Sequence, residues 1–160
     1  METIWRPRNK MIPKMAALLL FLLIMTVVRV SAKCSRHVIS DQLRKGEQLR
    51  KGEYLLSING NFKAVFQDDG NFVVYGPKPI WDSDTAGTYN ADHLIMQNDS
   101  NLVAYKTDGK AMWETNTYTS IGFKDCMLQL RNDGILIVAR DGYEVWSSAT
   151  SRGLKYGVNF

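Results

Sequence analysis

Apolar residues after position 32 occur in short clusters that alternate with polar positions, and turn dipeptides separate the clusters. The clusters are rich in Val, Ile, Phe and Tyr, which are residue types favoured in strands. No stretch of helical length in this part of the sequence carries an apolar stripe with a period of 3.6 residues. The separating dipeptides are Asn59-Gly60, Asp69-Gly70, Asp108-Gly109, Asp133-Gly134 and Asp141-Gly142. The pattern predicts an all-β chain, built as a sandwich, a barrel or a prism.

The strand pattern occurs three times, at residues 66–75, 96–105 and 130–139, and a tryptophan follows each copy. Trp81, Trp113 and Trp146 are 32 and 33 residues apart, a period that indicates one supersecondary unit copied three times. Three equal units favour pseudo-threefold symmetry, with the tryptophans meeting near the axis as core residues. Within each unit we expect roughly four strands, for example at residues 54–58, 63–67, 71–75 and 80–83 in the first unit.

The first two repeats share the same residues at every second position. Side chains at alternate positions of a strand point to one face of the sheet, so we expect each set to form a line. We name the sets site 1 (Gln67, Asp69, Asn71, Val73, Tyr75) and site 2 (Gln97, Asp99, Asn101, Val103, Tyr105). The carboxylate accepts hydrogen bonds, while the amides and the phenol both donate and accept. Such a line, with an apolar valine, suits the hydroxyl and C–H groups of a sugar and requires no metal or cofactor.

The pattern Gln-x-Asp-x-Asn-x-Val-x-Tyr of both sites resembles the mannose-site signature of the bulb-type (monocot, snowdrop-like) mannose-binding lectins. Residues 49–56 and 64–71 look most like the fish skin- and gill-mucus members of that family. The resemblance implies a β-prism II fold, with three four-stranded sheets around a pseudo-threefold axis. It also implies calcium-independent binding of mannose. Asp and Asn would contact the 2-hydroxyl, Gln the 3-hydroxyl or its neighbour and Tyr the 4-hydroxyl, while Val would pack on the ring.

The third repeat departs from this signature, because it lacks the Asn amide and the Tyr hydroxyl. The residues at its five positions are Arg131, Asp133, Ile135, Ile137 and Ala139. We expect this degenerate third site not to bind mannose and to serve only to close the prism. A second departure is Ser100, which stands where many members of the family have a cysteine, so their local disulfide is not expected here.

The first 32 residues have the pattern of a secretory signal peptide with an N-terminal extension. Basic residues precede an apolar run at residues 15–28, and the small residues Ser31 and Ala32 follow, so we expect cleavage after Ala32. The run of 14 residues is shorter than the roughly 20 that a membrane helix needs. A retained signal anchor is the alternative, and Met11 or Met15 is an alternative start.

The net charge of +4 belongs to this leader, which holds five basic residues and one acidic residue. Residues 33–160, which we expect to form one secreted lectin domain, hold 15 basic and 15 acidic residues and are therefore neutral. A neutral domain offers no electrostatic reason to bind nucleic acid or an anionic membrane. No membrane insertion is expected after processing.

The only two cysteines, Cys34 and Cys126, lie in this domain, and secretion makes a disulfide between them the first interpretation. Cross-linking to another chain is the alternative. Asn98 begins an Asn-x-Ser acceptor pattern for N-glycosylation inside site 2, and an unmodified turn asparagine is equally compatible with the sequence. Asn98 either alternates away from Gln97 and Asp99 or lies in a turn.

These features together predict a secreted mannose-binding lectin that acts on high-mannose glycans, typically of microbial surfaces in mucosal defence. The alternative is a β-prism module for protein interactions with vestigial sugar sites. An enzyme is not expected, because the carboxylate pairs are typical of acidic turns, and His37 and His93 have no spacing for a metal or triad. Weak single sites require multivalency, so we expect a homodimer or higher oligomer. The tail at residues 154–160 either adds a strand to a partner or frays.

Overall fold

The computed structural model describes residues 38–155, with side chains described between residues 40 and 153. The signal peptide expected at residues 1–32, together with Cys34, His37 and most of the C-terminal tail, lies outside the described residues. Among the residues that the structure describes, all regular elements are strands. None of the described residues forms a helix with the length and apolar character that a membrane crossing requires.

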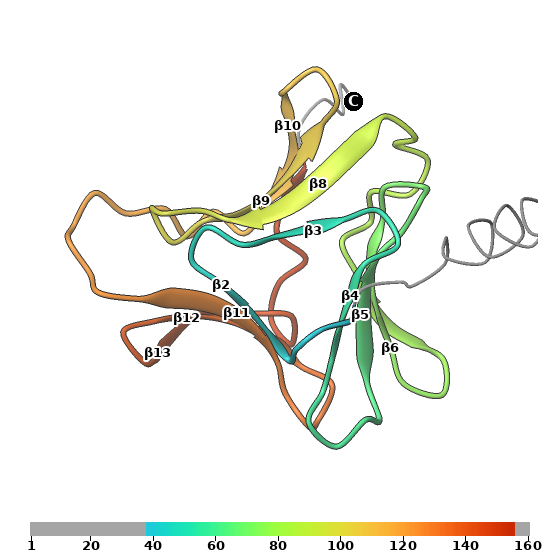
Figure 1. Cartoon of the computed structure of the whole chain (residues 1–160), viewed down its shortest axis with the longest axis horizontal. Helices are drawn as coiled ribbons and strands as arrows, with labels where there is room; N and C mark the ends of the chain where they lie inside the picture. Colours follow the sequence, from blue (N-terminus) through green and yellow to red (C-terminus); the bar gives the residue numbers. More distant parts are fainter. Residues whose placement is uncertain (1–37, 156–160) are drawn as a thin grey trace, which may run out of the picture. The chain divides into compact units, whose positions relative to one another are not determined.

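The strands form three sheets that face one another around a common centre (Figure 1). The first sheet has the order β1 (Val38–Ile39), β4 (Tyr54–Leu56), β5 (Lys63–Phe66), β6 (Phe72–Tyr75) and β7 (Pro79–Asp82). The second has the order β14 (Leu154–Lys155), β10 (Ala111–Glu114), β9 (Leu102–Lys106), β8 (Ala91–Met96) and β3 (Gln48–Arg50). The third has the order β13 (Tyr143–Ser147), β12 (Leu136–Arg140), β11 (Cys126–Leu130) and β2 (Gln42–Arg44).

Each sheet has a core of four antiparallel strands, which confirms the prediction of an all-β fold with three four-stranded sheets. Two sheets carry a further strand of two residues. β1 runs parallel to β4, and β14 runs antiparallel to β10. The four strands expected in the first unit are all present, with boundaries shifted by one or two residues.

The expectation that each unit supplies its own four strands is correct only for the first sheet. β2, β3 and β4 follow one another in the chain, yet each joins a different sheet (Figure 1). The reason is a six-residue repeat, because residues 42–47 and 48–53 both read Gln-Leu-Arg-Lys-Gly-Glu. The turns between these strands carry Gly46 and Gly52 at positive φ, and each sends the chain on to the next sheet.

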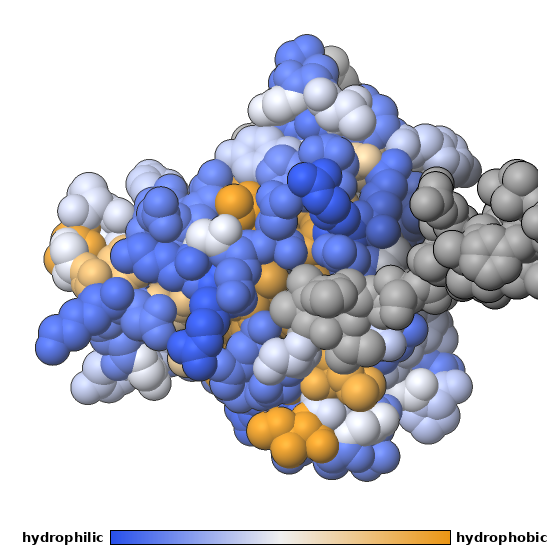
Figure 2. All heavy atoms as spheres, viewed as in Figure 1, coloured by the Kyte–Doolittle hydropathy of each residue, from blue (hydrophilic) through white to orange (hydrophobic). Residues whose placement is uncertain are grey.

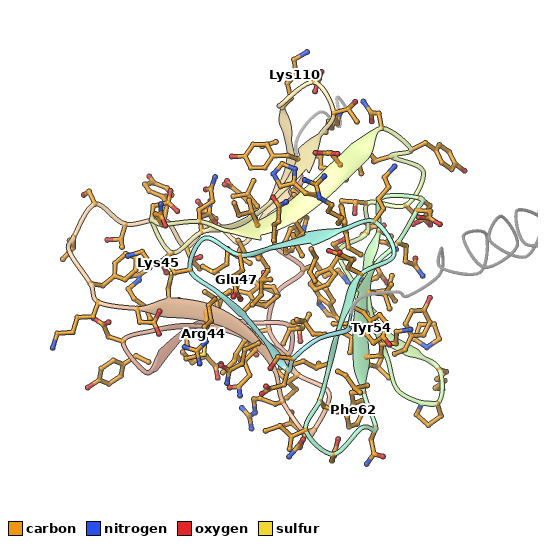
Figure 3. All side chains as sticks on the ribbon, viewed as in Figure 1. Arg44, Lys45, Glu47, Tyr54, Phe62 and Lys110 are labelled. Carbon is orange, nitrogen blue, oxygen red and sulfur yellow. The ribbon has the colours of Figure 1, made fainter. Side chains whose placement is uncertain are left out.

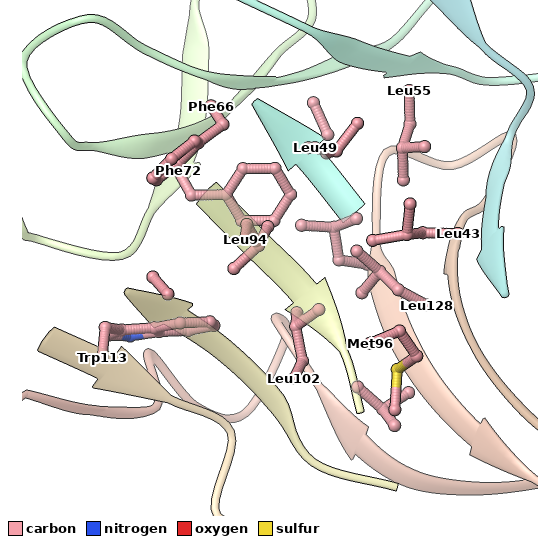
Figure 4. Packing of buried hydrophobic residues seen from close by; sticks show 14 of the residues in the cluster. Leu43, Leu49, Leu55, Phe66, Phe72, Leu94, Met96, Leu102, Trp113 and Leu128 are labelled. Carbon is pink, nitrogen blue, oxygen red and sulfur yellow. The ribbon is translucent and has the colours of Figure 1, made fainter. Parts of the chain in front are cut away.

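The core holds the inward side chains of all three sheets. Leu43, Leu49 and Leu55, six residues apart, are fully buried and enter the same cluster of apolar residues (Figure 4). Trp81, Trp113 and Trp146 meet there edge to face, with ring centroids 5.8–6.3 Å apart. The three sheets therefore share one core.

The C-terminal segment before β14 packs against two of the tryptophans. The indole Nε1 of Trp81 donates to the carbonyl oxygen of Ser151 at 3.1 Å, and Nε1 of Trp113 donates to that of Arg152 at 2.6 Å. Nε1 of Trp146 is buried and has no hydrogen-bond partner in the part of the chain that is described. The segment thus ties the first and second sheets together at the core.

Candidate functional site

The polar residues of sites 1 and 2 lie in hairpin connections as well as on strands. In site 1 the connection between β5 and β6 holds Gln67, Asp69 and Asn71, and only Val73 and Tyr75 lie in β6. The main chain closes here, because the Gln67 nitrogen donates to the Asn71 carbonyl oxygen at 2.8 Å. The expectation of one alternating strand line is therefore wrong for the first three positions, since a tight turn interrupts the pleat.

The Asp carboxylate of each site holds the turn. The backbone nitrogen of Asn71 donates to Oδ1 of Asp69 at 3.0 Å, and that of Asn101 donates to Oδ1 of Asp99 at 2.9 Å. This side-chain-to-backbone bond two residues on is the ordinary role of Asp in a turn. The protein thus engages Oδ1 of each carboxylate, and Oδ2 makes no hydrogen bond with the residues that the structure describes.

The turn brings the two ends of each set together. Nε2 of Gln67 donates to the Tyr75 hydroxyl at 2.6 Å, and Nε2 of Gln97 donates to the Tyr105 hydroxyl at 2.7 Å. The phenol oxygen accepts this bond and keeps its own O–H for another acceptor. The glutamine keeps its carbonyl oxygen as an acceptor. Residues eight positions apart in the chain therefore offer adjacent polar groups to a ligand.

Hydroxyl and backbone groups in the segment after the next strand, β7 in site 1 and β10 in site 2, fix the site asparagines. Oδ1 of Asn71 accepts from Oγ of Ser83 at 3.0 Å and from the backbone nitrogen of Thr85 at 3.1 Å. Oδ1 of Asn101 accepts in the same way from Thr115 and Thr117 at 3.1 and 3.2 Å. With Oδ1 occupied, Nδ2 is the group of each amide available for donation. Sequence reasoning missed these anchors, although the x-Ser/Thr-x-Thr pattern after Trp81 and Trp113 signals them.

Both faces of β6 and β9 are covered, which changes the role expected of the valines. Phe72, Val74, Leu102 and Ala104 are buried in the core as the alternation predicts. Val73 and Val103 are also buried, with 4% and 2% of their surface exposed. Each valine therefore offers a ligand only a narrow apolar contact and mainly supports the polar residues around it.

A shallow cleft lies beside each turn. The cleft at site 1 has a volume of about 330 Å³ and is lined by Gly52, Val65, Gln67, Asp68 and Asp69. The cleft at site 2 has a volume of about 350 Å³ and is lined by Gly46, Ile95, Gln97, Asn98 and Asp99. The six-residue repeat thus contributes one glycine to each cleft. Neither lining includes the Asn, Val and Tyr of the site, which follow the turn in the chain.

Asn98 lies in the turn of site 2 and is exposed at the rim of its cleft. It lines the same cleft as Gln97 and Asp99, so a glycan attached to Asn98 would stand at the entrance. N-glycosylation of Asn98 stays a prediction.

The third repeat fills the corresponding position with ion pairs. Arg131 contacts Asp133 with an Nη2–Oδ2 distance of 2.8 Å and Glu144 with an Nη1–Oε2 distance of 3.9 Å. Ala139, which stands at the position of the site tyrosines, is buried. The guanidinium is therefore held by carboxylates where sites 1 and 2 have a Gln–Tyr pair.

The β2–β3 turn carries the side chains of Arg44, Lys45 and Glu47 (Figure 3). A side chain closes this turn, because the Arg44 backbone nitrogen donates to Oε2 of Glu47 at 2.8 Å.

His93 packs beside the tyrosine of site 2. Its ring stacks on Tyr105 with centroids 5.4 Å apart, and Nδ1 lies 2.8 Å from Oδ2 of Asp92. The hydrogen bond to His93 is the main cause that lowers the pKa of Asp92. In site 1 the residue paired with Tyr75 is Lys63, whose Nζ lies over the ring of Tyr54 at 3.8 Å. The two sites therefore differ in the residue that lies opposite the site tyrosine on the neighbouring strand, which is a lysine in site 1 and a histidine in site 2.

Cys126 lies beneath the site 2 turn. Its thiol is buried and forms no disulfide with any residue that the structure describes, and Sγ donates to the carbonyl oxygen of Gln97 at 3.5 Å. Burial raises the pKa of this thiol. Cys34 lies outside the described residues, so the disulfide between Cys34 and Cys126 stays a prediction.

The surface around the sheets is mostly hydrophilic on the face shown in Figure 2, with hydrophobic residues in separate areas. The described residues contain no cluster of three or more His, Cys, Asp or Glu side chains arranged to hold a metal ion.

Comparison with known proteins gives a consistent set of relatives. The chain is 49% identical over 113 residues to B-type lectin plumieribetin of Scorpaena plumieri, which covers 71% of the chain and 98% of the relative. Among solved structures, a monomeric monocot mannose-binding lectin from Gastrodia elata has a TM-score of 0.61, with 32% identity over 69% of the chain and 98% of that protein. The snowdrop (Galanthus nivalis) mannose-specific agglutinin in complex with methyl-α-D-mannoside has a TM-score of 0.56, with 34% identity over 69% of the chain and 97% of that protein. No family model matches the chain.

Proposed function

Because the chain belongs to the bulb-type (B-type) lectin family and has its β-prism II fold, we propose that it is a secreted lectin that binds mannose-containing glycans. Site 1 and site 2 are the binding sites, and binding requires no calcium. The observation that carries the proposal is the geometry common to both sites. In each, a Gln–Tyr hydrogen bond and an anchored Asn surround an Asp that keeps one carboxylate oxygen for a ligand.

The polar groups match the hydroxyls of a mannose ring. The Asp carboxylate accepts from a hydroxyl in a charge-assisted bond, and the Asn Nδ2 donates to the same or a neighbouring hydroxyl. The Tyr hydroxyl donates, and the Gln carbonyl oxygen accepts. Since these groups supply both donors and acceptors, mannose is held without a bridging cation. By the family resemblance, Asp69 and Asn71 contact the 2-hydroxyl in site 1, and Asp99 and Asn101 do so in site 2.

Affinity for one mannose is expected to be weak. Each hydrogen bond contributes about 0.5–1.5 kcal/mol net, and four such bonds at a shallow site correspond to millimolar binding, about −4 kcal/mol. Two sites on different sheets of one chain, doubled in a dimer or higher oligomer, raise the affinity for a multivalent surface by about 10²–10⁴. High-mannose glycans of microbial surfaces provide such spacing, and mucosal defence is the proposed role of the secreted protein.

Affinity chromatography of the secreted protein on mannose-agarose, with a chelator present, tests this function. We expect retention and elution by free mannose. A requirement for calcium contradicts the metal-free mechanism. Lack of retention contradicts mannose binding and favours a protein-interaction module with vestigial sites.

Replacing both site carboxylates tests the assignment of residues. In the double variant Asp69→Asn/Asp99→Asn, the new amide oxygens still accept the turn bonds from the Asn71 and Asn101 nitrogens, so the turns are preserved. The loss of the charged acceptor is expected to reduce mannose-agarose retention at least about tenfold, because hydrogen bonds to charged groups contribute about 1.5–3 kcal/mol each.

Asp133→Asn is the matched control for this double variant. Asp133 holds its turn through the same bond, from the Ile135 nitrogen at 3.1 Å, but lies in the degenerate third repeat. We expect Asp133→Asn to bind like the unaltered protein. Retention that persists in the double variant, or that is lost in the control, shows that the residues are wrongly assigned.

A further inference from the structure

The asparagines of the two sites differ in one hydrogen bond. In site 2, Nδ2 of Asn101 donates to Oε2 of Glu114 at 2.6 Å. Glu114 lies on β10 directly opposite Val103 of the site. In site 1 the equivalent residue is Asp82 on β7, which lies opposite Val73. Both sites therefore have a carboxylate at the same register position, one methylene longer in site 2, and the third repeat has Ser147 there, opposite Ile137.

Asp82 is engaged away from its asparagine. Its Oδ1 accepts from the backbone nitrogen of Asp84 at 2.7 Å and pairs with Nη1 of Arg152 at 3.0 Å. The same guanidinium nitrogen donates to the Asp82 carbonyl oxygen at 3.0 Å. The C-terminal segment thus fixes this shorter carboxylate toward Arg152 rather than toward Asn71.

Glu114 stands on a strand that is held on both sides. β10 pairs with β9 through Val103 and with β14 through Leu154. Gly153 leaves no room for a side chain against the Glu114 carbonyl oxygen and the Trp113 ring. A carboxylate on such a strand has a defined position, and its bond to a buried amide is charge-assisted, which is the stronger class of hydrogen bond.

The bond to Glu114 completes the positioning of the Asn101 amide. Oδ1 already accepts from Thr115 and Thr117, and Nδ2 gives one of its two hydrogens to Glu114. Asn101 is only 4% exposed, so the second Nδ2 hydrogen is the remaining polar contact that the side chain offers. An amide held at three points loses no rotamer freedom when a ligand binds, and such preorganisation raises affinity.

We propose that Glu114 is a positioning residue of site 2, which holds the Asn101 amide for the sugar and makes site 2 the tighter of the two mannose sites. This inference rests on the proposed function of the two sites. The mechanism requires a side-chain oxygen that accepts from Nδ2 of the site asparagine. Glu114 is long enough to provide this oxygen to Asn101, whereas the shorter Asp82 pairs with Arg152 and does not provide one to Asn71.

Variants with a single working site provide the test. Asp69→Asn leaves site 2 alone, and Asp99→Asn leaves site 1 alone. NMR titration with methyl-α-D-mannoside is expected to show three- to tenfold tighter binding by the Asp69→Asn protein. Adding Glu114→Ala to Asp69→Asn is expected to weaken binding three- to tenfold. Adding Glu114→Gln, which keeps an acceptor oxygen at the same reach, is expected to preserve affinity within twofold.

Two further measurements separate positioning from a general effect on the fold. Glu114→Ala is expected to shift the side-chain amide resonances of Asn101, and Glu114→Gln to return them toward the original position. The matched control Asp82→Ala in the Asp99→Asn background is expected to leave the affinity of site 1 within twofold.

The outcomes distinguish the inference from the function on which it rests. If neither single-site protein binds methyl-α-D-mannoside, the proposed function fails and the role of Glu114 fails with it. If both bind, but Glu114→Ala does not weaken site 2, or Glu114→Gln weakens it equally, the inference alone is overturned. Equal affinity of the two sites also overturns it.

Discussion

At the scale of single residues, the turns of the sites depend on one left-handed position. Gly70, Ser100 and Gly134 occupy it in the three repeats, with φ of 86°, 74° and 84°. Glycine adopts this conformation without steric strain, whereas a serine in the same conformation is strained. Ser100 is fully buried, and its Oγ accepts from Nε of Arg140 at 3.0 Å, which holds it in place. The Asp-Gly dipeptides of the first and third repeats predict these turns, and the similarity of the second repeat to the first predicts the turn at Asp99-Ser100.

Gly70→Ala is expected to destabilise the protein by about 2–4 kcal/mol, because strain at positive φ adds to overpacking. A Cβ at Gly70 would overlap the carbonyl oxygen of Thr88. Gly87→Ala is the matched control, since φ there is 85° and nothing lies within 4 Å of an added Cβ. It is expected to cost about 1 kcal/mol, the conformational strain alone. Urea unfolding measures both, and equal losses contradict the steric contribution.

At the scale of elements, the three short strands β2, β3 and β4 determine how the sheets close. β2 and β3 belong to two copies of one six-residue pattern, and each of the three strands places one fully buried leucine in the common core, at a spacing of six residues. Each turn after the first two strands is held by a glutamate, with Oε2 of Glu47 accepting from the Arg44 nitrogen and Oε2 of Glu53 from the Arg50 nitrogen. This segment thus contributes one strand to each of the three sheets and connects them through the chain, whereas the next three strands of each sheet come from a single repeat.

Leu49→Ala on β3 is expected to lower the free energy of unfolding by about 2–5 kcal/mol, because it leaves a cavity in the shared core. Arg50→Ala on the same strand is the control, since Arg50 is exposed and its backbone bond to Glu53 is retained. Its effect is expected to stay within about 0.5 kcal/mol. Chemical denaturation compares the two, and a loss below about 1 kcal/mol for Leu49→Ala would show that β3 contributes little to the core.

At the scale of the described domain, the three sheets meet at three tryptophans, and the symmetry there is incomplete. The carbonyl oxygens of Ser151 and Arg152 accept from Trp81 and Trp113, while Trp146 has no partner for its indole nitrogen among the described residues. In the same segment Arg152 pairs with the Asp82 carboxylate, and the segment leads directly into β14, which pairs with β10. One segment therefore makes three similar sheets inequivalent, at the core and at the sites.

Trp113→Phe is expected to be more destabilising than Trp146→Phe by about 1–2 kcal/mol. Both variants lose ring volume, but only the first also loses a hydrogen bond and leaves the Arg152 carbonyl oxygen unpaired. Trp81→Phe, which loses the bond to Ser151, is expected to resemble Trp113→Phe. Denaturant unfolding ranks the three variants, and the reverse order excludes this account of the core.

The sequence by itself determined the features that depend on residues close together in the chain. Alternating apolar positions and Asp-Gly turns act within about ten residues, so the strands, the repeats and the members of both polar sets were predicted. Tertiary structure alone decided how distant segments meet. Pairing between separate strands decides which of β2, β3 and β4 joins each sheet. The same pairing brings the hydroxyl groups of Ser83 and Thr115 to Asn71 and Asn101, and stacks His93 on Tyr105. The contrast between Glu114 and Asp82 rests on one methylene and on the position of Arg152, which no local pattern records.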